Sequence, residues 1–160
     1  MKDWTGDRNS VFKTLAASNH SPEDRAENDF YATEPRALEL LLELEKFNAY
    51  IWEPACGQGH LSEVLLDYGY RVRSSDLYDR GYKHGENGVD FLKVTESVDC
   101  DILTNPPYKF AQQFVEHALS LIPEGNKVIM FLKLQFLEGQ ARRKLFDKYP
   151  PRKFMWLARD

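Results

Sequence analysis

The clearest chemistry in the sequence lies in four consecutive residues, Asn105-Pro106-Pro107-Tyr108, which follow an apolar segment. The side-chain oxygen of Asn105 and the backbone carbonyl of Pro106 can accept hydrogen bonds from both protons of one amino group. Because two consecutive prolines hold the backbone extended, these acceptors are preorganised. Acceptors of this kind push a planar amino nitrogen toward a tetrahedral, more nucleophilic state, so the tetrapeptide predicts catalysis on an exocyclic amino group. Tyr108 offers a flat ring on which a flipped-out base can stack, and Phe110 offers a second ring.

A second group of residues, Glu53-Pro54-Ala55-Cys56-Gly57-Gln58-Gly59, predicts a ligand-binding turn between a strand and a helix. Gly57 and Gly59 have no Cβ, so the backbone there can approach a ligand closely. Asp76 ends the next predicted strand, at residues 71–76, where its carboxylate can accept hydrogen bonds from both hydroxyls of a ribose. A tight turn without a ligand remains the alternative, as does a proline-rich turn without a catalytic role at Asn105–Tyr108.

Two ligands compete for this turn. A dinucleotide site requires a third small residue, which Ser62 supplies, and places a pyrophosphate on the helix N-terminus. S-adenosylmethionine has no phosphate and carries a sulfonium cation. An acid directly before the turn, Glu53, suits the cation and suits a pyrophosphate badly. The residues therefore favour S-adenosyl-L-methionine as cofactor, with its methyl group transferred in line to the amino nitrogen and proximity as the main catalytic effect.

The elements that must position these residues alternate between apolar strands and amphipathic helices. This alternation predicts an α/β fold with a doubly wound, mostly parallel sheet, which binds ligands at the carboxyl ends of its strands. The predicted strands are 50–53, 71–76, 100–104, 127–132 and 154–157, the predicted helices are about 34–46, 61–68, 109–122 and 138–148, and a glycine-containing loop fills much of 77–88.

The composition limits the class of protein. Hydrophobic residues make up 42% of the 160 residues, as in ordinary globular domains, and no apolar run is long enough to span a bilayer. The N-terminus has no apolar stretch that would indicate a secretory signal. Cys56 and Cys100 form neither a CxxC motif nor a Cys/His cluster, so we expect no metal site, no disulfide framework and a cytoplasmic location.

The net charge of −4 bears on possible partners. Proteins dedicated to nucleic-acid binding are usually basic, because phosphate contacts supply most of their non-specific affinity. Any nucleic-acid contact here must come from a local patch or from a part outside this sequence. The best local candidate is Arg142, Arg143, Lys144, Lys148, Arg152 and Lys153, for which a solvated helix face is an equal alternative.

The motifs together resemble the Asn-Pro-Pro-Tyr class of amino methyltransferases, most closely the small phage- or prophage-type DNA adenine methyltransferases. The resemblance covers about residues 29–158. It implies that residues 30–35 pack around the methionine end of the cofactor, that Asp76 binds the ribose, and that Asp90 and Phe91 meet the cofactor adenine at its amino group and its ring. The cofactor-binding residues expected in all are Tyr31, Thr33, Glu53, Pro54, Ala55, Gly57, Gly59, Asp76, Leu77, Asp90, Phe91 and Asn105.

The same resemblance implies a class I, Rossmann-like methyltransferase acting on adenine in DNA, in the cytoplasm of a bacterial or phage-infected cell. We expect an N-terminal arm at 1–28 and a catalytic domain at 29–160, without a separate target recognition domain. In this family the last strand inserts beside Val128–Leu132, whereas Asp160 falls at about the sixth strand. We therefore expect a catalytic domain shortened at its C-terminus, whose open sheet edge invites a dimer or a partner subunit.

Three alternatives remain open on the sequence. The same chemistry suits an RNA base or a protein glutamine amide, and the acidic net charge slightly favours these substrates over DNA. The third alternative is a non-catalytic subunit that binds the cofactor and needs a partner for recognition.

Overall fold

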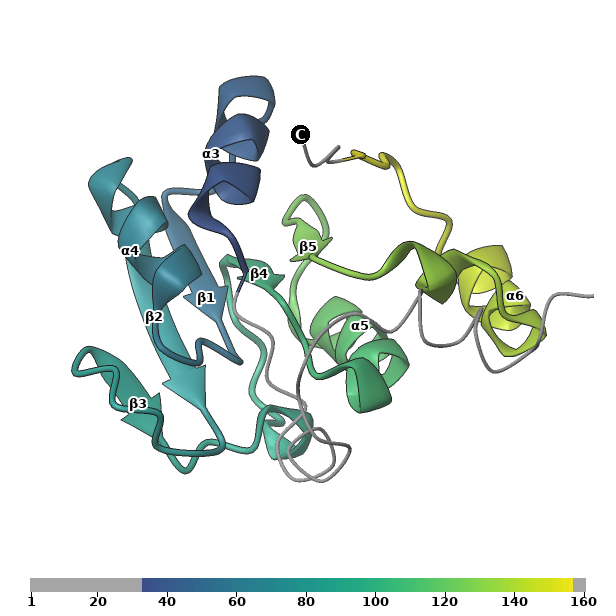
Figure 1. Ribbon diagram of the computed structural model, residues 1–160. Helices are drawn as coiled ribbons and strands as arrows, with labels where there is room; N and C mark the ends of the chain where they lie inside the picture. The colour runs from purple at the N-terminus through teal and green to yellow at the C-terminus, as the bar shows by residue number, and fades with distance from the viewer. Residues whose placement is uncertain (1–32, 157–160) are drawn as a thin grey trace, which may run out of the picture.

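The computed structural model describes residues 33–156, which form a five-stranded sheet with helices on both faces (Figure 1). The strands are β1 (Tyr50–Glu53), β2 (Arg71–Asp76), β3 (Gly85–Asn87), β4 (Asp101–Thr104) and β5 (Val128–Met130). The helices are α3 (Pro35–Leu44), α4 (His60–Asp67), α5 (Ala111–Leu121) and α6 (Gln140–Lys148), with the short 3₁₀ helices η1 (Phe91–Lys93), η2 (Tyr108–Phe110) and η3 (Leu134–Leu137).

The sheet has the strand order β3-β2-β1-β4-β5, and every pair of neighbouring strands is parallel. From β1 the chain first adds strands on one side and then, with β4, on the other. The order therefore reverses between β1 and β4, and this reversal is the switch point at which doubly wound sheets bind ligands. The predicted fold class is confirmed.

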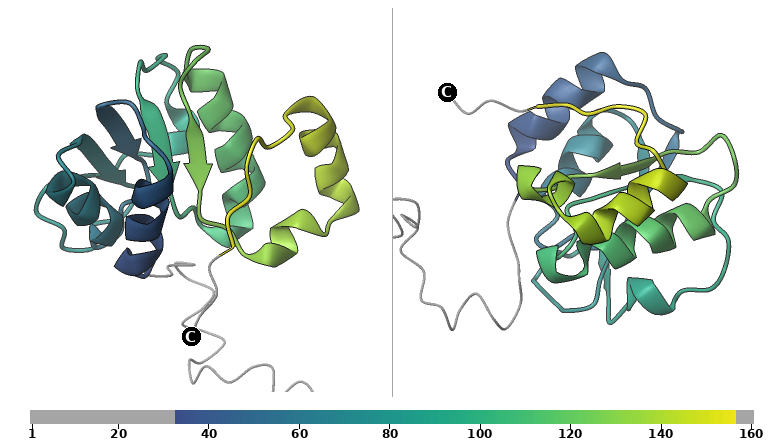
Figure 2. Two further views of the ribbon diagram at one scale, coloured as in Figure 1. Left: turned by 90° about the horizontal axis from the view of Figure 1, so that it is seen from above. Right: turned by 90° about the vertical axis from the view of Figure 1, so that its right-hand side faces the viewer.

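Alternate residues of the two central strands point to opposite faces of the sheet, as the strand geometry requires. Ile51 and Leu103 pack on the face covered by α3 and α4. Trp52 and Ile102 pack on the other face, in one cluster with residues of α5 and η1. Figure 2 shows the sheet between these two helical layers, with α6 lying beside α5. Both faces are buried, which is why consecutive residues in the middle of these strands, Ile51-Trp52 and Ile102-Leu103, are all apolar.

The helix ends follow the local sequence. Pro35 occupies the first turn of α3, where a missing backbone N–H costs nothing. Gly69 has a φ of +87° just after α4, where glycine commonly ends a helix. No helix within residues 33–156 is long and apolar enough to cross a membrane.

Two predicted features differ from the structure. Residues 85–87, expected within a loop, form strand β3, which pairs with Ser74–Asp76 of β2. Conversely, Phe154–Trp156 form no strand, and Phe154 and Trp156 are 53% and 71% exposed. A strand requires a neighbour for its backbone hydrogen bonds, and none of the described residues pairs with this segment. Within the described residues β5 is therefore an edge strand, while the expected arm at 1–28 lies outside them.

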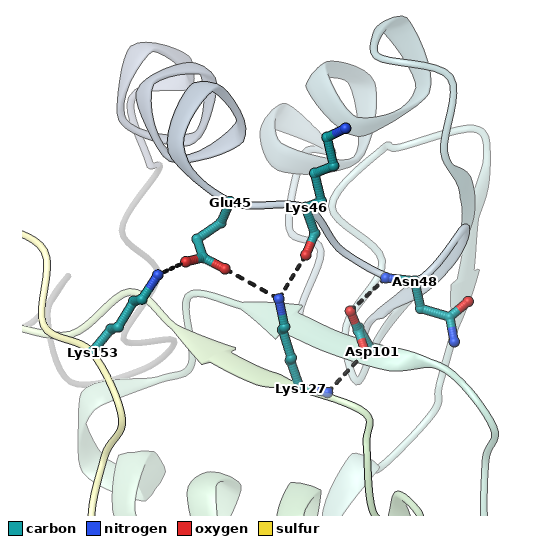
Figure 3. Close-up of polar contacts among 6 residues, drawn as sticks. All are labelled: Glu45, Lys46, Asn48, Asp101, Lys127 and Lys153. Carbon is teal, nitrogen blue, oxygen red and sulfur yellow. Dashed lines mark hydrogen bonds and ion pairs between the residues drawn. The ribbon is translucent and has the colours of Figure 1, made fainter.

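Lys153, just before this segment, forms an ion pair with Glu45 at the end of α3 (Figure 3). The Glu45 carboxylate also accepts a hydrogen bond from the Lys127 ammonium at 3.1 Å. Lys153 therefore lies near the amino ends of the strands, beside the end of α3.

Candidate active site

A cavity of about 560 Å³ opens at the carboxyl ends of β1, β2 and β4, at the switch point of the sheet. This volume lies within the usual range for small-molecule sites, roughly 300–1,000 Å³. The cavity brings together residues that lie far apart in the sequence. The predicted site residues on its wall are Thr33, Glu53, Pro54, Ala55, Asp76, Leu77, Asp90, Phe91, Asn105, Pro107 and Phe110.

Glu53 ends β1 and is only 1% exposed, yet it forms part of the cavity wall. The Ser62 hydroxyl donates a hydrogen bond to its carboxylate and also bonds the Ser74 hydroxyl at 2.6 Å. Burial raises the pKa of Glu53 to about 8, and the hydrogen bonds from Ser62 offset only part of this rise. A carboxyl group that burial holds protonated will ionise when a cation binds beside it, so Glu53 suits a positively charged ligand.

Asp76 ends β2 and ties the glycine turn to that strand. Its Oδ2 accepts the Gly57 backbone N–H at 2.9 Å, and its Oδ1 accepts the Tyr78 backbone N–H at 2.9 Å. The Arg80 Nε atom lies 3.8 Å from Oδ1. Each carboxylate oxygen has a second lone pair, so these contacts fix the orientation of Asp76 while leaving it capacity to accept a ribose hydroxyl.

Gly57 and Gly59 do not contribute to the cavity wall, although both were predicted to let a ligand approach. Gly59 has a φ of +84°, and a Cβ added there would lie 2.3 Å from the Tyr82 ring. The Tyr82 hydroxyl in turn donates to the Glu63 carboxylate at 2.7 Å. The described structure therefore requires glycine at 59 for the close packing of Tyr82, a role that the sequence did not indicate.

Asn105 follows β4 and is held by Thr33. Its side-chain Nδ2 donates to the Thr33 Oγ1 at 2.7 Å, which fixes the orientation of the amide. The Pro107 carbonyl accepts the Phe110 backbone N–H at 2.9 Å as the chain enters η2. The Pro107 carbonyl therefore already accepts a hydrogen bond within the turn. Pro106, the residue directly after Asn105, is buried.

The two aromatic residues after the prolines differ in position. Phe110 lines the cavity and is 40% exposed, whereas Tyr108 is half-buried and does not form part of the cavity wall. A lysine ammonium lies over each ring. Lys109 Nζ is 5.7 Å from the Phe110 ring centroid, and Lys133 Nζ is 4.0 Å from that of Tyr108.

Asp90 and Phe91 come from the loop that enters η1. The Asp90 carboxylate accepts the Leu92 backbone N–H at 3.2 Å and caps η1, and its other oxygen pairs with the Lys93 ammonium. Phe91 is 2% exposed and packs edge-on against Trp52, with ring centroids 5.2 Å apart. Both residues line the cavity as well as filling these structural roles.

Several residues of the cavity wall were missed by the sequence analysis. Arg80 lies four residues after Asp76, and that spacing is the only sequence signal that could have indicated it. Burial raises the pKa of the Cys56 thiol to about 12, so it stays neutral near pH 7. Tyr31, predicted to bind the cofactor, lies outside the described residues. The missed wall residues are Cys56, Gln58, His60, Leu61, Tyr78, Arg80, Val89, Leu92, Lys93, Lys109 and Phe114.

No protein-family model matches the chain, and no curated protein matches it. Solved structures do resemble it. A proposed RNA methyltransferase from Pyrococcus horikoshii superimposes with a TM-score of 0.54 at 16% identity, over 89% of this chain and 81% of that one. The 23S rRNA methyltransferase ErmE gives a TM-score of 0.53 at 18% identity, over 74% and 52% of the two chains.

TehB from Haemophilus influenzae gives a TM-score of 0.47 at 14% identity, over 66% of this chain and 43% of that one. The chain thus spans less than half of TehB and about half of ErmE. At these identities the likeness concerns the fold, for which the two scores above 0.5 and the all-parallel order β3-β2-β1-β4-β5 agree. The chain has the fold of the class I, Rossmann-like methyltransferases.

Proposed function

We propose that the protein is an S-adenosylmethionine-dependent methyltransferase that acts on an exocyclic amino group. The observation that carries the proposal is one cavity whose wall joins Glu53, Asp76 and Asn105 from the carboxyl ends of three parallel strands. A cation-binding acid, a ribose-binding acid and an amino-group acceptor thereby share one site.

The residues present fit this cofactor. Glu53, whose pKa is raised to about 8 by burial, gains a favourable partner when a cationic group enters the cavity. Asp76 is oriented by the backbone of Gly57 and Tyr78 and would receive the ribose hydroxyls. Phe91 presents an apolar ring for the adenine. When bound, S-adenosylmethionine supplies a methyl group on a positively charged sulfur, which leaves as a neutral thioether.

The protein's own contribution to transfer is to hold the amino group. In this proposal the Asn105 Oδ1 and the Pro106 carbonyl each accept a hydrogen bond from one of its two N–H groups, while Thr33 keeps the Asn105 amide from rotating. Tyr108 and Phe110 stack on the base that carries the amino group. No side chain forms a covalent bond, in keeping with the neutral thiol of Cys56.

Adenine in DNA is the substrate we propose, on the basis of the Asn-Pro-Pro-Tyr resemblance, with the base flipped out of its stack. The second candidate is an RNA base, because the Pyrococcus horikoshii protein and ErmE, which superimpose with TM-scores of 0.54 and 0.53, are named as RNA methyltransferases. A protein glutamine amide would use the same acceptors and is the third outcome of the test below.

Two measurements test the proposal. Calorimetry with S-adenosylmethionine measures cofactor binding, and absence of binding by folded protein would remove the cofactor assignment. Transfer of a labelled methyl group to DNA, RNA and protein pools then identifies the substrate. We expect Asn105→Ala to lower the transfer rate by about 10²–10³-fold, the usual cost of losing one such transition-state contact.

The matched control is Asn126→Ala. Asn126 donates its side-chain amide to Asp99 at the opposite end of the sheet, so its loss should leave the transfer rate unchanged. An Asn105→Ala protein as active as the wild type would disprove the mechanism. Cofactor binding without transfer to any pool would favour the non-catalytic subunit.

A further inference from the structure

Both aromatic rings that follow the prolines carry a lysine ammonium over one face. Lys109 is the immediate neighbour of Phe110, but Lys133 comes from the segment after β5 and reaches Tyr108, which follows β4. The ammonium of Lys133 is 4.0 Å from the Tyr108 ring centroid. Since the chain has a net charge of −4, this local positive charge does not reflect a generally basic surface.

We propose that Lys133 is a substrate-positioning residue, which contacts a backbone phosphate next to the target base. This proposal rests on the proposed function and adds that the target is part of a phosphodiester chain. A base stacked on Tyr108 has its sugar and phosphate beside that ring, within the range that the flexible four-carbon stem of Lys133 sweeps.

The proposal gives the Lys133 ammonium two alternative positions, one over the Tyr108 ring, as in this structure, and one on the phosphate. An ammonium at 4.0 Å covers one face of the Tyr108 ring, so a base that stacks on this face must displace it. A cation on a phosphate forms a charge-assisted hydrogen bond and releases a counterion, which favours the displaced position of the ammonium once a base is stacked. Base stacking and the phosphate contact therefore support one another. A glutamine side chain on a neutral peptide offers no anion for the displaced ammonium.

The test measures binding without requiring catalysis. The full chain is titrated into fluorescein-labelled single-stranded DNA and RNA oligonucleotides with one adenine, and anisotropy gives the dissociation constant at several salt concentrations. For Lys133→Ala we expect weaker binding by about tenfold and a salt slope smaller by about 0.7, the value for one phosphate contact on a single strand. Lys133→Arg should restore most of the slope, because it keeps the charge.

Lys127→Ala is the matched control, because its ammonium also lies over a ring, 5.4 Å from that of Phe47, but at the opposite end of the sheet. It should keep the wild-type slope. An oligonucleotide with an uncharged methylphosphonate beside the adenine should weaken wild-type binding as Lys133→Ala does, without weakening the variant further.

The outcomes separate this proposal from the proposed function. If Lys133→Ala keeps the wild-type salt dependence of binding, the phosphate contact of Lys133 is disproved. It is also disproved if Lys148→Ala reduces the salt dependence instead, because the contact would then lie on α6. Failure of the wild type to bind either oligonucleotide also overturns it, even if a protein pool is methylated. Binding with the expected Lys133 dependence but without methyl transfer upholds the phosphate contact and contradicts the proposed function.

Discussion

The two ends of the parallel sheet each hold a buried carboxylate that accepts two backbone N–H groups, and they use it differently. At the amino end, Asp101 accepts the N–H groups of Asn48 and Lys127 at 2.7 and 2.8 Å (Figure 3). At the carboxyl end, Asp76 accepts those of Gly57 and Tyr78. Asp101 thereby joins the starts of three strands, whereas Asp76 joins a strand to the turn beside the cavity.

The second acid at each end sharpens the contrast. Glu45, near Asp101, already has two cations, because Lys127 and Lys153 both reach it. Glu53, near Asp76, is held by the neutral hydroxyl of Ser62 and lines the cavity. A buried acid is therefore not a site in itself. What distinguishes the carboxyl end is an acid that is held by a neutral hydroxyl and borders a space large enough for a ligand.

Replacement of Asp101 and Asp76 tests this comparison with the largest expected effect. Asp101→Ala leaves two part-buried backbone N–H groups without an acceptor, which should cost about 4 kcal/mol of the free energy of unfolding. Asp76→Ala should cost about as much, because it leaves the buried N–H group of Gly57 and the part-buried one of Tyr78 without an acceptor. Urea unfolding measures both values.

Cofactor affinity is the complementary measurement. At a temperature where both variants are folded, Asp76→Ala should weaken S-adenosylmethionine binding by at least about tenfold, and Asp101→Ala should leave it unchanged. Equal losses of affinity in the two variants would contradict the division between a structural and a functional end.

Two glycines in the left-handed region provide a second test. Gly59→Ala should destabilise the protein by about 3 kcal/mol, because the φ of +84° is strained for alanine and the new Cβ would meet Tyr82 at 2.3 Å. Gly69→Ala has a similar φ of +87° but open space around it, so we expect about 1 kcal/mol. Thermal unfolding distinguishes the two.

The larger loss of stability expected for Gly59→Ala than for Gly69→Ala should depend on the Tyr82 side chain. Adding Tyr82→Ala to Gly59→Ala removes the clash, so the two substitutions together should cost less than the sum of the two alone. Strict additivity would show that Tyr82 does not enforce glycine at position 59.

The sequence predicted the parts of the site that follow from strand ends. Glu53 and Asp76 each end a predicted strand and Asn105 directly follows one, and the carboxyl ends of parallel strands meet at one edge, so their convergence was predictable. The strand β3 could not be predicted, because Gly85–Asn87 has no alternation of apolar residues and is a strand only through its pairing with β2. The prediction of a strand at Phe154–Trp156 was wrong for the opposite reason. These residues have high β propensity, but a segment forms no strand without a neighbouring strand to pair with.

The contacts that support the motif residues also could not be predicted from the sequence. Ser62 holds Glu53 and is itself bonded to Ser74, Tyr82 packs on Gly59, and Lys133 lies over the Tyr108 ring. Serine, tyrosine and lysine are common on any surface, and nothing in their spacing distinguishes these from others of the same type. Their roles arise only when the tertiary fold places them against the motif.

The smallest expected effect concerns the ionisation of Glu53. Its pKa of about 8 means that the empty site holds a proton at pH 7, which a cationic ligand must displace. S-adenosylmethionine affinity should therefore rise nearly tenfold per pH unit between pH 6 and 7 and level off above about pH 8. The α-amino group of the ligand, with a pKa of about 7.7–8.0, stays mostly charged over the rising part. Calorimetry at several pH values measures this slope.

Glu53→Gln provides the control, because an amide keeps the hydrogen bond to Ser62 but cannot ionise, so its affinity should not rise with pH. Stability should change in the opposite direction from affinity. The raised pKa favours the folded state below about pH 4.5, and this contribution is lost as the pH rises to about 8, because the folded protein binds the proton more tightly than the unfolded chain. If wild type and Glu53→Gln share one pH slope, Glu53 stays neutral beside the ligand, and Asp76 must then balance the ligand's positive charge.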